Sequence, residues 1–327
     1  MHSFELVAVG ELLYALRAPY SRLLTQTRML SCHCTGAEFN VAMGASRLGL
    51  KTAFVSKVCR NFIGRFAVET LQGCDVNTQG VVLAKEGRMG VLYQEYGIPP
   101  RPSSNVYDRD DAAFLSLSPV EIEWSVLNGA KCVYISGVTA ALGKGPRDVI
   151  QEAFRRAKQA GALRVFDANF RSALWSEEEA RVCIKAILKQ VDICFIKIDD
   201  ARRVLGEDGR PEDILDKIRN HYGINLVVMT LGADGAIASN GCLYRESAVA
   251  IPQMINRFGL GDAFAAGFLY GYFKGELPKA LRYATAAAAL KSTYTDESFI
   301  QFEAEDVEDL IKSQDTNTSL PQGTVKR

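Results

Sequence analysis

The sequence has no excess of charge of either sign and no long hydrophobic run. Its 327 residues include 38 Lys and Arg against 38 Asp and Glu. Balanced charge provides no general attraction to nucleic acid or to an acidic membrane surface. The apolar runs fall well short of the ~20 residues that a membrane-spanning helix needs. Residues 1–10 also lack a basic segment followed by a long apolar stretch, so we expect neither a membrane anchor nor a signal peptide.

Paired cysteine motifs are absent as well. The eight cysteines are scattered, none forms a CxxC pair, and several lie in apolar segments, as reduced core thiols do. The stretch SCHCTG at 31–36 contains Cys-His-Cys, but no second cluster completes the four ligands of a structural zinc site. We therefore predict a cytoplasmic protein without a zinc site at this position.

Strand-like and helix-like segments alternate along most of the chain. Apolar runs typical of buried strands occur at 4–12, 51–58, 131–137, 163–169, 191–198 and 225–232. Segments with helical patterns lie between them, at 38–50, 146–160, 176–190, 199–205 and 211–221. Buried strands separated by amphipathic helices predict an α/β fold, with a central, mainly parallel sheet that helices cover on both faces.

Two segments interrupt this alternation. Residues 11–35 and 87–109 lack helical periodicity and are richer in Tyr, Arg, Ser and Pro. We interpret them as a small β-sheet that stands off the main domain as a lid. Residues 1–312 then form one domain. The polar tail from Ser313 to Arg327 has little to bury, so we expect it to be disordered.

The stretch NRFGLGDAFAAGFLYGYF, residues 256–273, places Gly259, Leu260 and Gly261 just before Asp262 at the start of an apolar helix. Free backbone N–H groups and the helix dipole attract an anion at such a helix end. Asp262 would then take a proton from a hydroxyl that attacks a phosphoryl group, while the turn stabilises the developing charge. The alternative is a tight turn with Asp262 as an ordinary helix cap. This stretch alone supports both interpretations equally.

Several motifs together resemble the ribokinase-like (PfkB) carbohydrate kinases. Residues 256–262 are similar to that family's C-terminal signature, D-[TR]-x-G-[AG]-G-D, and TGAEFNVAMGASRLG at 35–49 is similar to its N-terminal one. The resemblance spans roughly residues 4–312. Within the family, the chain most resembles the 2-keto-3-deoxygluconate kinases, through Arg257 and the stretches GELL (10–13), GAEFNVA (36–42), RPSSNVYDR (101–109), DANFRSALW (167–175) and ALKSTYTDE (289–297). It implies a ribokinase-like fold and transfer of the ATP γ-phosphate to 2-keto-3-deoxygluconate, which gives the 6-phosphate.

The resemblance also implies roles for individual residues. Asp262 would be the base, and the backbone N–H groups of Gly259, Leu260 and Gly261 would form an anion hole. The fork-shaped donors of Arg109 and Arg171 suit a carboxylate. Taken singly, each arginine is better explained as a solvated surface charge and each tyrosine as lid packing. The residues implied to bind the sugar acid are Gly36, Asn40, Tyr93, Tyr107, Arg109, Asn169 and Arg171.

On the nucleotide side, no G-x-x-x-x-G-K-[ST] motif occurs, which excludes the P-loop kinases. TLGADG at 230–235 instead resembles the turn along which the family binds ATP. It implies nucleotide contacts from Thr230, Gly232, Ala233 and Gly235, although an ordinary β-turn also explains these glycines. Mg²⁺ would arrive with ATP and keep most of its waters, so few dedicated carboxylates are expected.

Departures from the family pattern gather on the phosphate side. The family's Asn-x-x-Glu motif reads Lys197 to Asp200 here, so Asp200 is the candidate metal ligand, and Lys197 would either hold a phosphate or repel the metal. Leu260 replaces Ala or Gly, and it would narrow the turn or force a backbone conformation that Gly prefers. Asn256 replaces Asp near a monovalent-cation site of relatives, so K⁺ is a further candidate cofactor. The other departures are Thr35, Cys59, Arg60, Asp296 and Glu297.

We therefore expect a kinase that uses ATP and Mg²⁺ to phosphorylate a sugar acid, with no nucleic-acid or membrane partner. One rival is a kinase for a neutral sugar or nucleoside, in which two arginines would have no carboxylate to hold. A second rival is a sugar-acid-binding homologue with weakened catalysis, favoured by Lys197 and Asn256. A structural oligomer without a ligand is the third, and the sugar-side motifs argue against it. The lid sheet is a candidate surface for homo-oligomerisation.

Overall fold

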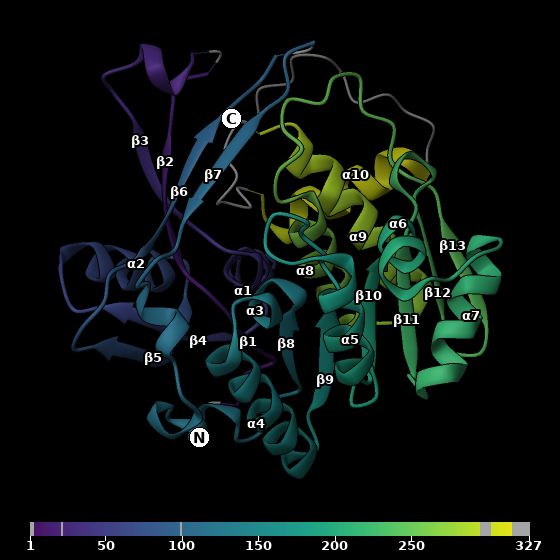
Figure 1. Ribbon diagram of the computed structural model, residues 1–327. Helices are drawn as coiled ribbons and strands as arrows, with labels where there is room; N and C mark the ends of the chain where they lie inside the picture. The colour runs from purple at the N-terminus through teal and green to yellow at the C-terminus, as the bar shows by residue number, and fades with distance from the viewer. Residues whose placement is uncertain (1–2, 21, 99, 295–301, 316–327) are drawn as a thin grey trace.

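A central sheet of nine strands runs through the larger part of the molecule (Figure 1). The computed structural model describes residues 3–20, 22–98, 100–294 and 302–315. The strand order is β13-β12-β11-β10-β9-β8-β1-β4-β5, with every pair parallel except the antiparallel β11–β12 and β12–β13 pairs at one edge. The bounds are Leu6–Val9 (β1), Thr52–Cys59 (β4), Val76–Ala84 (β5), Cys132–Ser136 (β8), Leu163–Asp167 (β9), Ile193–Lys197 (β10), Leu226–Thr230 (β11), Ala236–Ser239 (β12) and Leu243–Glu246 (β13).

Helices cover both faces of this sheet. In β1, Val7 and Val9 pack into one core layer, whereas Leu6 and Ala8 point to the opposite side, and all four are fully buried. The first layer contains α4 (Lys144–Ala160), α5 (Glu177–Leu188) and α7 (Pro211–Tyr222). The opposite face packs against α1 (Ala37–Arg47), α8 (Leu260–Lys274), α9 (Leu277–Ser292) and α10 (Ala304–Asp315), with α2 (Phe62–Gln72) beside β4 and β5. The predicted α/β fold with a mainly parallel, doubly covered sheet is confirmed.

The remaining helical elements of the described residues are short turns. These are α3 (Gly137–Ala141), α6 (Ile198–Asp200), a π-helical turn at Ala201–Leu205, and 3-10 turns at Leu24–Gln26, Ala113–Ser116, Pro119–Glu121, Trp124–Leu127 and Gly232–Asp234.

The expected segments differ from the observed elements mainly at their ends, but the sequence patterns did not predict β5, β12, β13, α2 or α9. Ser176, expected as the first residue of a helix, is instead the N-cap of α5, because its hydroxyl accepts the backbone N–H of Glu179. The helix expected at 199–205 is divided into α6 and the π-helical turn.

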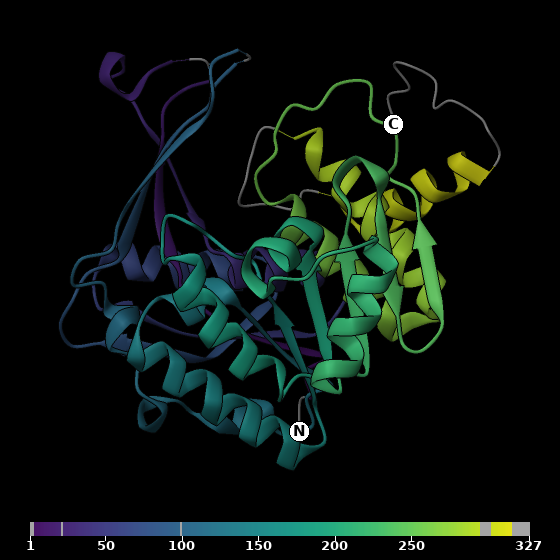
Figure 2. The ribbon, with the colours of Figure 1, turned by 45° about the vertical axis from the view of Figure 1, so that its right-hand side comes forward.

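A second sheet of four strands stands off the main body as predicted, and we call it the lid (Figures 1 and 2). Its order is β3-β2-β6-β7, with β2 and β6 parallel and the outer pairs antiparallel. The purple and blue ribbons show that it is built from two separate parts of the chain. The strands are β2 (Leu13–Arg17), β3 (Ser31–Thr35), β6 (Gly90–Glu95) and β7 (Ser104–Asp108), all within the segments 11–35 and 87–109.

The C-terminal boundary differs slightly from the expected one. Helix α10 continues to Asp315, so Ser313 is helical and does not begin an irregular tail. The expectation of disorder for the remaining residues, 316–327, lies outside the described residues. Of the helices in the described part of the chain, none has the length and apolar character needed to cross a bilayer.

Candidate active site

Candidate residues from three neighbouring strands meet at the carboxyl edge of the central sheet. Asp167 ends β9, Lys197 ends β10 and Thr230 ends β11. The sheet register pairs Lys197 directly with Thr230, and it pairs Phe195 with Asp167. Ligands of open α/β sheets bind at such carboxyl edges, so the fold places these side chains where a site is expected.

Asp262 lies in the first turn of α8 and is almost completely buried. Its Oδ2 accepts a hydrogen bond of 2.7 Å from Nδ2 of Asn40, which lies in the first turn of α1. The two residues are 222 positions apart, and the packing of α1 against α8 brings them together. This contact makes Asp262 more than a helix cap, because a side chain from a second helix holds its carboxylate.

Burial decides the acid–base behaviour of Asp262. Burial raises its pKa above the ordinary aspartate value, because a low-dielectric environment disfavours the charged form. The Asn40 hydrogen bond and the nearby positive charges of Arg171, Lys197 and Lys291 lower the pKa but do not fully offset burial. A carboxylate with a raised pKa is a better proton acceptor near neutral pH than an ordinary surface aspartate.

The backbone before Asp262 turns sharply into the helix. Gly259 is the N-cap, with φ of 72°, a left-handed conformation that glycine adopts without strain. Leu260 is the first helical residue and does not have positive φ, so its side chain forces no unfavourable conformation. The first N–H groups of any helix lack intrahelical acceptors, and here they belong to the Leu260–Gly261–Asp262 turn.

Two further carboxylates, Asp167 and Asp200, share with Asp262 the electrostatic influence of one lysine. Burial raises the pKa of Asp167 to about 7 and also raises the pKa of Asp200. The positive charge of exposed Lys197 lowers the pKa of both, and of Asp262, so one ammonium group acts on three acidic groups. Lys197 therefore offsets negative charge where an anionic phosphate would have to approach.

Asp167 was not among the site residues predicted from the sequence. Its Oδ2 accepts a hydrogen bond of 3.2 Å from the hydroxyl of Tyr134, and its Oδ1 accepts the backbone N–H of Asn169. The sequence signal is that Asp167 opens the DANFRSALW stretch, but the charged groups that act on it come from β10, α6 and α8.

On the lid side, Arg109 is already paired. Its Nε donates to Oε2 of Glu11 at 2.8 Å, and both side chains are largely buried. Its guanidinium also stacks over the ring of Tyr107 at 4.3 Å from the ring centre. Glu11, which the sequence analysis did not select, has its other oxygen buried without a hydrogen-bond partner among the described residues. Gly36 packs so closely here that a Cβ atom would lie 2.3 Å from the Glu11 carbonyl oxygen.

Asn169 and Arg171 present groups that the described structure leaves unused. Asn169 is buried with φ of 34°, and its Oδ1 has no hydrogen-bond partner in the described part of the chain. A buried polar atom without a partner costs free energy, which is a reason to expect a ligand there. Arg171 is exposed, yet its charge acts on both Asp262 and Asp200.

Tyr93 is not brought together with the other predicted sugar-binding residues. The register of β6 and β7 pairs Leu92 with Tyr107, and it pairs Tyr93 with Val106. Opposed residues in a sheet share a face and successive residues alternate, so Tyr93 points to the face opposite Tyr107. Because Tyr107 stacks on Arg109, the face of Tyr107 is the one toward the candidate site. Tyr93 therefore lies on the other face of the lid from Tyr107, and we leave it out of the sugar-binding set proposed below.

The predicted nucleotide turn follows β11. Gly232 and Ala233 are exposed in a 3-10 turn, and Thr230 is half-buried. Gly232 and Gly235 have φ of 65° and 87°. Positive φ at both glycines means that the turn needs them structurally, whether or not a nucleotide lies alongside.

The remaining departures have local partners. Asn256 is buried, and its Oδ1 accepts the backbone N–H of Phe258 at 2.9 Å. The Thr35 hydroxyl lies 3.5 Å from Oδ1 of Asn40. Buried Cys59 donates through its thiol to Asn61, the N-cap of α2, while Arg60 is exposed. Asp296 and Glu297 lie outside the described residues.

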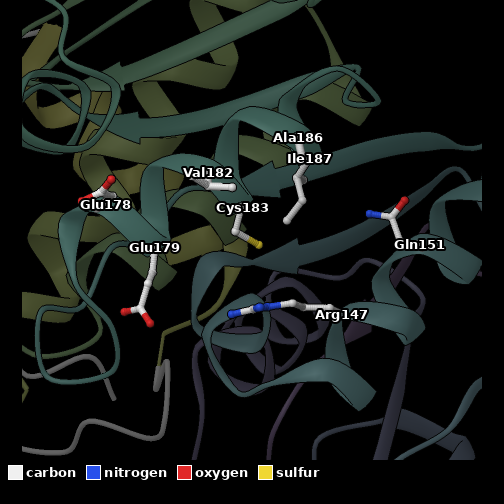
Figure 3. A pocket seen from close by; sticks show the side chains of 8 residues that line it. All are labelled: Arg147, Gln151, Glu178, Glu179, Val182, Cys183, Ala186 and Ile187. Atoms are coloured by element: carbon white, nitrogen blue, oxygen red, sulfur yellow. The ribbon is translucent and has the colours of Figure 1, made fainter.

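A separate cavity of about 450 Å³ lies between α4 and α5 (Figure 3). In Figure 3, Arg147 and Gln151 of α4 face Val182 and Cys183 of α5. It lies in the helical layer on the opposite face of the sheet from α8, and it contains none of the predicted site residues.

No cluster of three or more His, Cys, Asp or Glu side chains capable of holding a metal ion occurs in the described ranges. The acidic groups near α8 are therefore not, by themselves, a complete metal cage.

Comparisons with known proteins identify the family of the chain. The pfkB family carbohydrate kinase profile matches residues 3–300. A 2-dehydro-3-deoxygalactonokinase of Haloferax volcanii is 36% identical over 290 residues, covering 88% of this chain and 91% of that protein. A 5-dehydro-2-deoxygluconokinase of Bacillus velezensis is 31% identical over 317 residues, covering 95% of each. The crystal structure of a 2-dehydro-3-deoxygluconokinase of Thermotoga maritima matches with a TM-score of 0.87 at 28% identity, covering 95% of this chain and 99% of that one. The chain therefore belongs to the pfkB family of carbohydrate kinases and is a phosphotransferase that acts on a sugar.

Proposed function

We propose that the protein transfers the γ-phosphate of ATP to the terminal hydroxyl of 2-keto-3-deoxygluconate, giving the 6-phosphate. The observation that carries this proposal is the buried Asp262 carboxylate in the first turn of α8, held by Asn40 at 2.7 Å. The similar proteins are named for three dehydro-deoxy sugar acids, which supports this class of substrate. The choice of the gluconate within that class rests on the motifs of the sequence.

In the proposed mechanism, Asp262 acts as the base. Asn40 occupies Oδ2, so we assign proton transfer from the sugar hydroxyl to Oδ1. The deprotonating hydroxyl attacks the γ-phosphorus, and ADP leaves. The N–H groups of the Gly259–Leu260–Gly261 turn would stabilise the negative charge that develops on the transferred group.

The sugar acid would be held between the lid and the sheet edge. Arg171, which has no ion-pair partner among the described residues, would bind the carboxylate, whereas Arg109 can offer only its terminal nitrogens because Nε is engaged with Glu11. The unpartnered Oδ1 of Asn169 would accept a sugar hydroxyl. Gly36, Asn40 and Tyr107 complete the proposed set.

ATP would lie along Thr230, Gly232, Ala233 and Gly235, with Lys197 near its phosphates. The donor set suits Mg²⁺, since Asp167 and Asp200 offer carboxylate oxygens and Mg²⁺ usually takes only one or two, plus phosphate and water. When bound, Mg²⁺ would neutralise phosphate charge, and Asp200 and Asp167 would hold the metal ion. Relatives have an Asp near a monovalent-cation site, where this chain has the neutral Asn256. The test is therefore run with and without K⁺, to see whether turnover depends on this ion.

A second candidate is a sugar-acid-binding homologue with weakened catalysis. Lys197 among the acidic groups is the observation that favours it, since its ammonium competes with Mg²⁺ for the same carboxylates. Leu260 does not favour it, because its backbone is helical.

The test is ADP release from ATP and Mg²⁺ by the purified protein, with and without K⁺. The acceptors are 2-keto-3-deoxygluconate, its galactonate epimer, 5-dehydro-2-deoxygluconate and the neutral sugars fructose and ribose. Asp262→Asn should lower kcat by about 10²- to 10⁴-fold. Asp148→Asn, at an exposed position on α4, is the matched control and should leave kcat unchanged.

The acceptor profile then separates the candidates. Preferred turnover of the gluconate, lost in Asp262→Asn, supports the proposal. Preferred turnover of another sugar acid corrects only the substrate, and turnover of neutral sugars alone overturns the sugar-acid assignment. Binding of the acid by calorimetry without any turnover establishes the weakened homologue.

Two coarser expectations belong to the same proposal. We place the protein in a reducing compartment such as the cytoplasm, since all eight cysteines are free thiols. We also propose a homo-oligomer formed through the face of the lid opposite Tyr107, where Val106 is 56% exposed.

A further inference from the structure

A tyrosine of the lid contacts the segment that leads into the turn before Asp262. Tyr96 follows β6 of the lid and is buried, although the lid stands off the main body. Its hydroxyl accepts a hydrogen bond of 3.0 Å from Nδ2 of Asn256, 160 residues further along the chain. Its ring lies 5.8 Å from the ring of Phe258. Tyr96 therefore contacts two residues of the segment immediately before Gly259.

The lid holds Tyr96 in place from its own side. Nη1 of Arg17, the last residue of β2, donates to the Tyr96 hydroxyl at 3.2 Å. The Arg17 guanidinium also lies over the Tyr96 ring, 5.3 Å from its centre. The hydroxyl thus accepts one hydrogen bond from the lid and one from the loop of the main domain.

The loop is fixed on its other side by α9. The backbone N–H groups of Ile255 and Asn256 both donate to the carbonyl oxygen of Ser292, at 2.9 and 3.1 Å. Within the loop, Oδ1 of Asn256 accepts from the Phe258 backbone N–H. One amide side chain therefore joins the lid to the residue that precedes the N-cap of α8.

We propose that Tyr96 is a positioning residue that docks the lid on the 255–258 loop and so orders the turn that receives the transferred phosphate. This inference rests on the proposed function, because the turn matters for turnover only if phosphoryl transfer occurs there. Asn256 has a role in this arrangement that Asp could not fill in the same way, since only the amide can donate to the tyrosine oxygen while accepting from Phe258. The substitution of Asn for the family's Asp then serves lid docking.

The first experiment compares Tyr96→Phe with Tyr20→Phe. Tyr20 is a matched lid tyrosine whose ring contacts Tyr96 but which is 56% exposed. We expect Tyr96→Phe to lower kcat by about 3- to 10-fold, the effect of losing the hydrogen bond that Asn256 donates to the hydroxyl, with KM for ATP unchanged. Tyr20→Phe should match the wild type. A lower stability alone would not produce this separation of kcat from KM.

The second measurement needs no substrate. Hydrogen exchange of the backbone amides of 255–261 should be faster in Tyr96→Phe and unchanged in Tyr20→Phe. Asn256→Ala removes the amide contacts with Tyr96 and Phe258 and should have at least as large an effect. Adding Tyr96→Phe to Asn256→Ala should change little further, because the contact is already lost.

The outcomes separate this inference from the proposed function. Unchanged exchange in both Tyr96→Phe and Asn256→Ala overturns the docking role, whatever the enzyme phosphorylates. Faster exchange in a protein that phosphorylates none of the sugars supports docking and defeats the proposed function. Turnover with unaltered kcat in Tyr96→Phe overturns the positioning role while leaving the proposed function intact.

Discussion

At the scale of single residues, burial sets the chemistry of the candidate site. Asp262, Asp167 and Asp200 all have pKa values raised by burial, in spite of the positive charge of Lys197 close by. Desolvation therefore outweighs the attraction to that exposed ammonium. The same argument applies to Glu11, whose pKa burial raises even though Arg109 is hydrogen-bonded to it.

Asp167 should make stability depend on pH. Its pKa rises from 3.8 to about 7 on folding, so the folded protein binds a proton that the unfolded chain has released. The stabilising contribution is complete below pH 4 and is lost as pH rises toward 7. We predict that Asp167→Asn raises Tm relative to the wild type more at pH 8 than at pH 5, measured by thermal unfolding.

The exposed Asp148→Asn variant serves as the control for that measurement and should show the same small difference at both pH values. An equal Tm difference for Asp167→Asn at pH 5 and pH 8 would contradict the prediction.

Arg171 should govern affinity for the sugar acid. Arg171→Gln removes the free guanidinium, and a charge-assisted bidentate contact contributes more than a neutral hydrogen bond. We predict that KM for the sugar acid rises by at least about 10-fold. KM for ATP should change less, and steady-state kinetics with each substrate varied separately measures both. Exposed Arg60, changed to Gln, is the control, and a similar change in both variants would remove Arg171 from the sugar site.

At the scale of elements, the start of α8 shows which departure from the family pattern matters. Leu260 occupies a helical position, and Gly259 carries the left-handed turn. Leu260, which differs from the family pattern, therefore bears no backbone strain, and Gly259, which has the positive φ, is retained. Whether a substitution is tolerated here depends on its position within the turn more than on the size of the new side chain.

Gly259→Ala and Leu260→Ala form a matched pair of tests. An alanine at φ of 72° costs about 1–2 kcal/mol, whereas alanine is favourable at a helical position. We predict a lower Tm and a clear loss of kcat for Gly259→Ala, and activity within a few-fold of the wild type for Leu260→Ala. The reverse order would show that the Leu260 side chain itself supports catalysis.

At the scale of the whole molecule, the lid combines an inner face toward the site with an exposed outer face. Val106 shares the outer face with Tyr93, and the outer strands β3 and β7 each have one unpaired edge in the described sheet. An exposed apolar sheet face next to open edges favours association. The same sheet would then serve both the substrate and a second copy of the chain.

Val106→Glu tests that association. Burying a carboxylate in an interface is costly, so we predict that the variant shifts the protein from an oligomer toward a monomer. Light scattering coupled to size-exclusion chromatography measures the mass. Val120→Glu, at an exposed valine outside the lid, is the control and should leave the mass unchanged. A monomeric wild type would refute the proposed oligomer.

Local patterns made much of the fold predictable. Strand β10 and helix α7 follow the expected segments closely, because a buried apolar run and an amphipathic period are properties of neighbouring residues. The turn before Asp262 was recognisable for the same reason, since glycine beside a helix start is a local signal. Motif resemblance added the roles of the residues, and those roles are still predictions.

By itself, the amino-acid sequence determined many of the strand and helix segments and the two lid segments, and it placed Asp262 at the start of a helix. Only the tertiary structure decided that Tyr93 faces away from Tyr107, because a strand's faces are assigned by its pairing with β7. It also decided that Arg109 pairs with Glu11 and that Tyr96 meets Asn256. These contacts join residues 98 and 160 positions apart, and no local pattern encodes them. The raised pKa values have the same origin, because burial is produced by all the packed elements together.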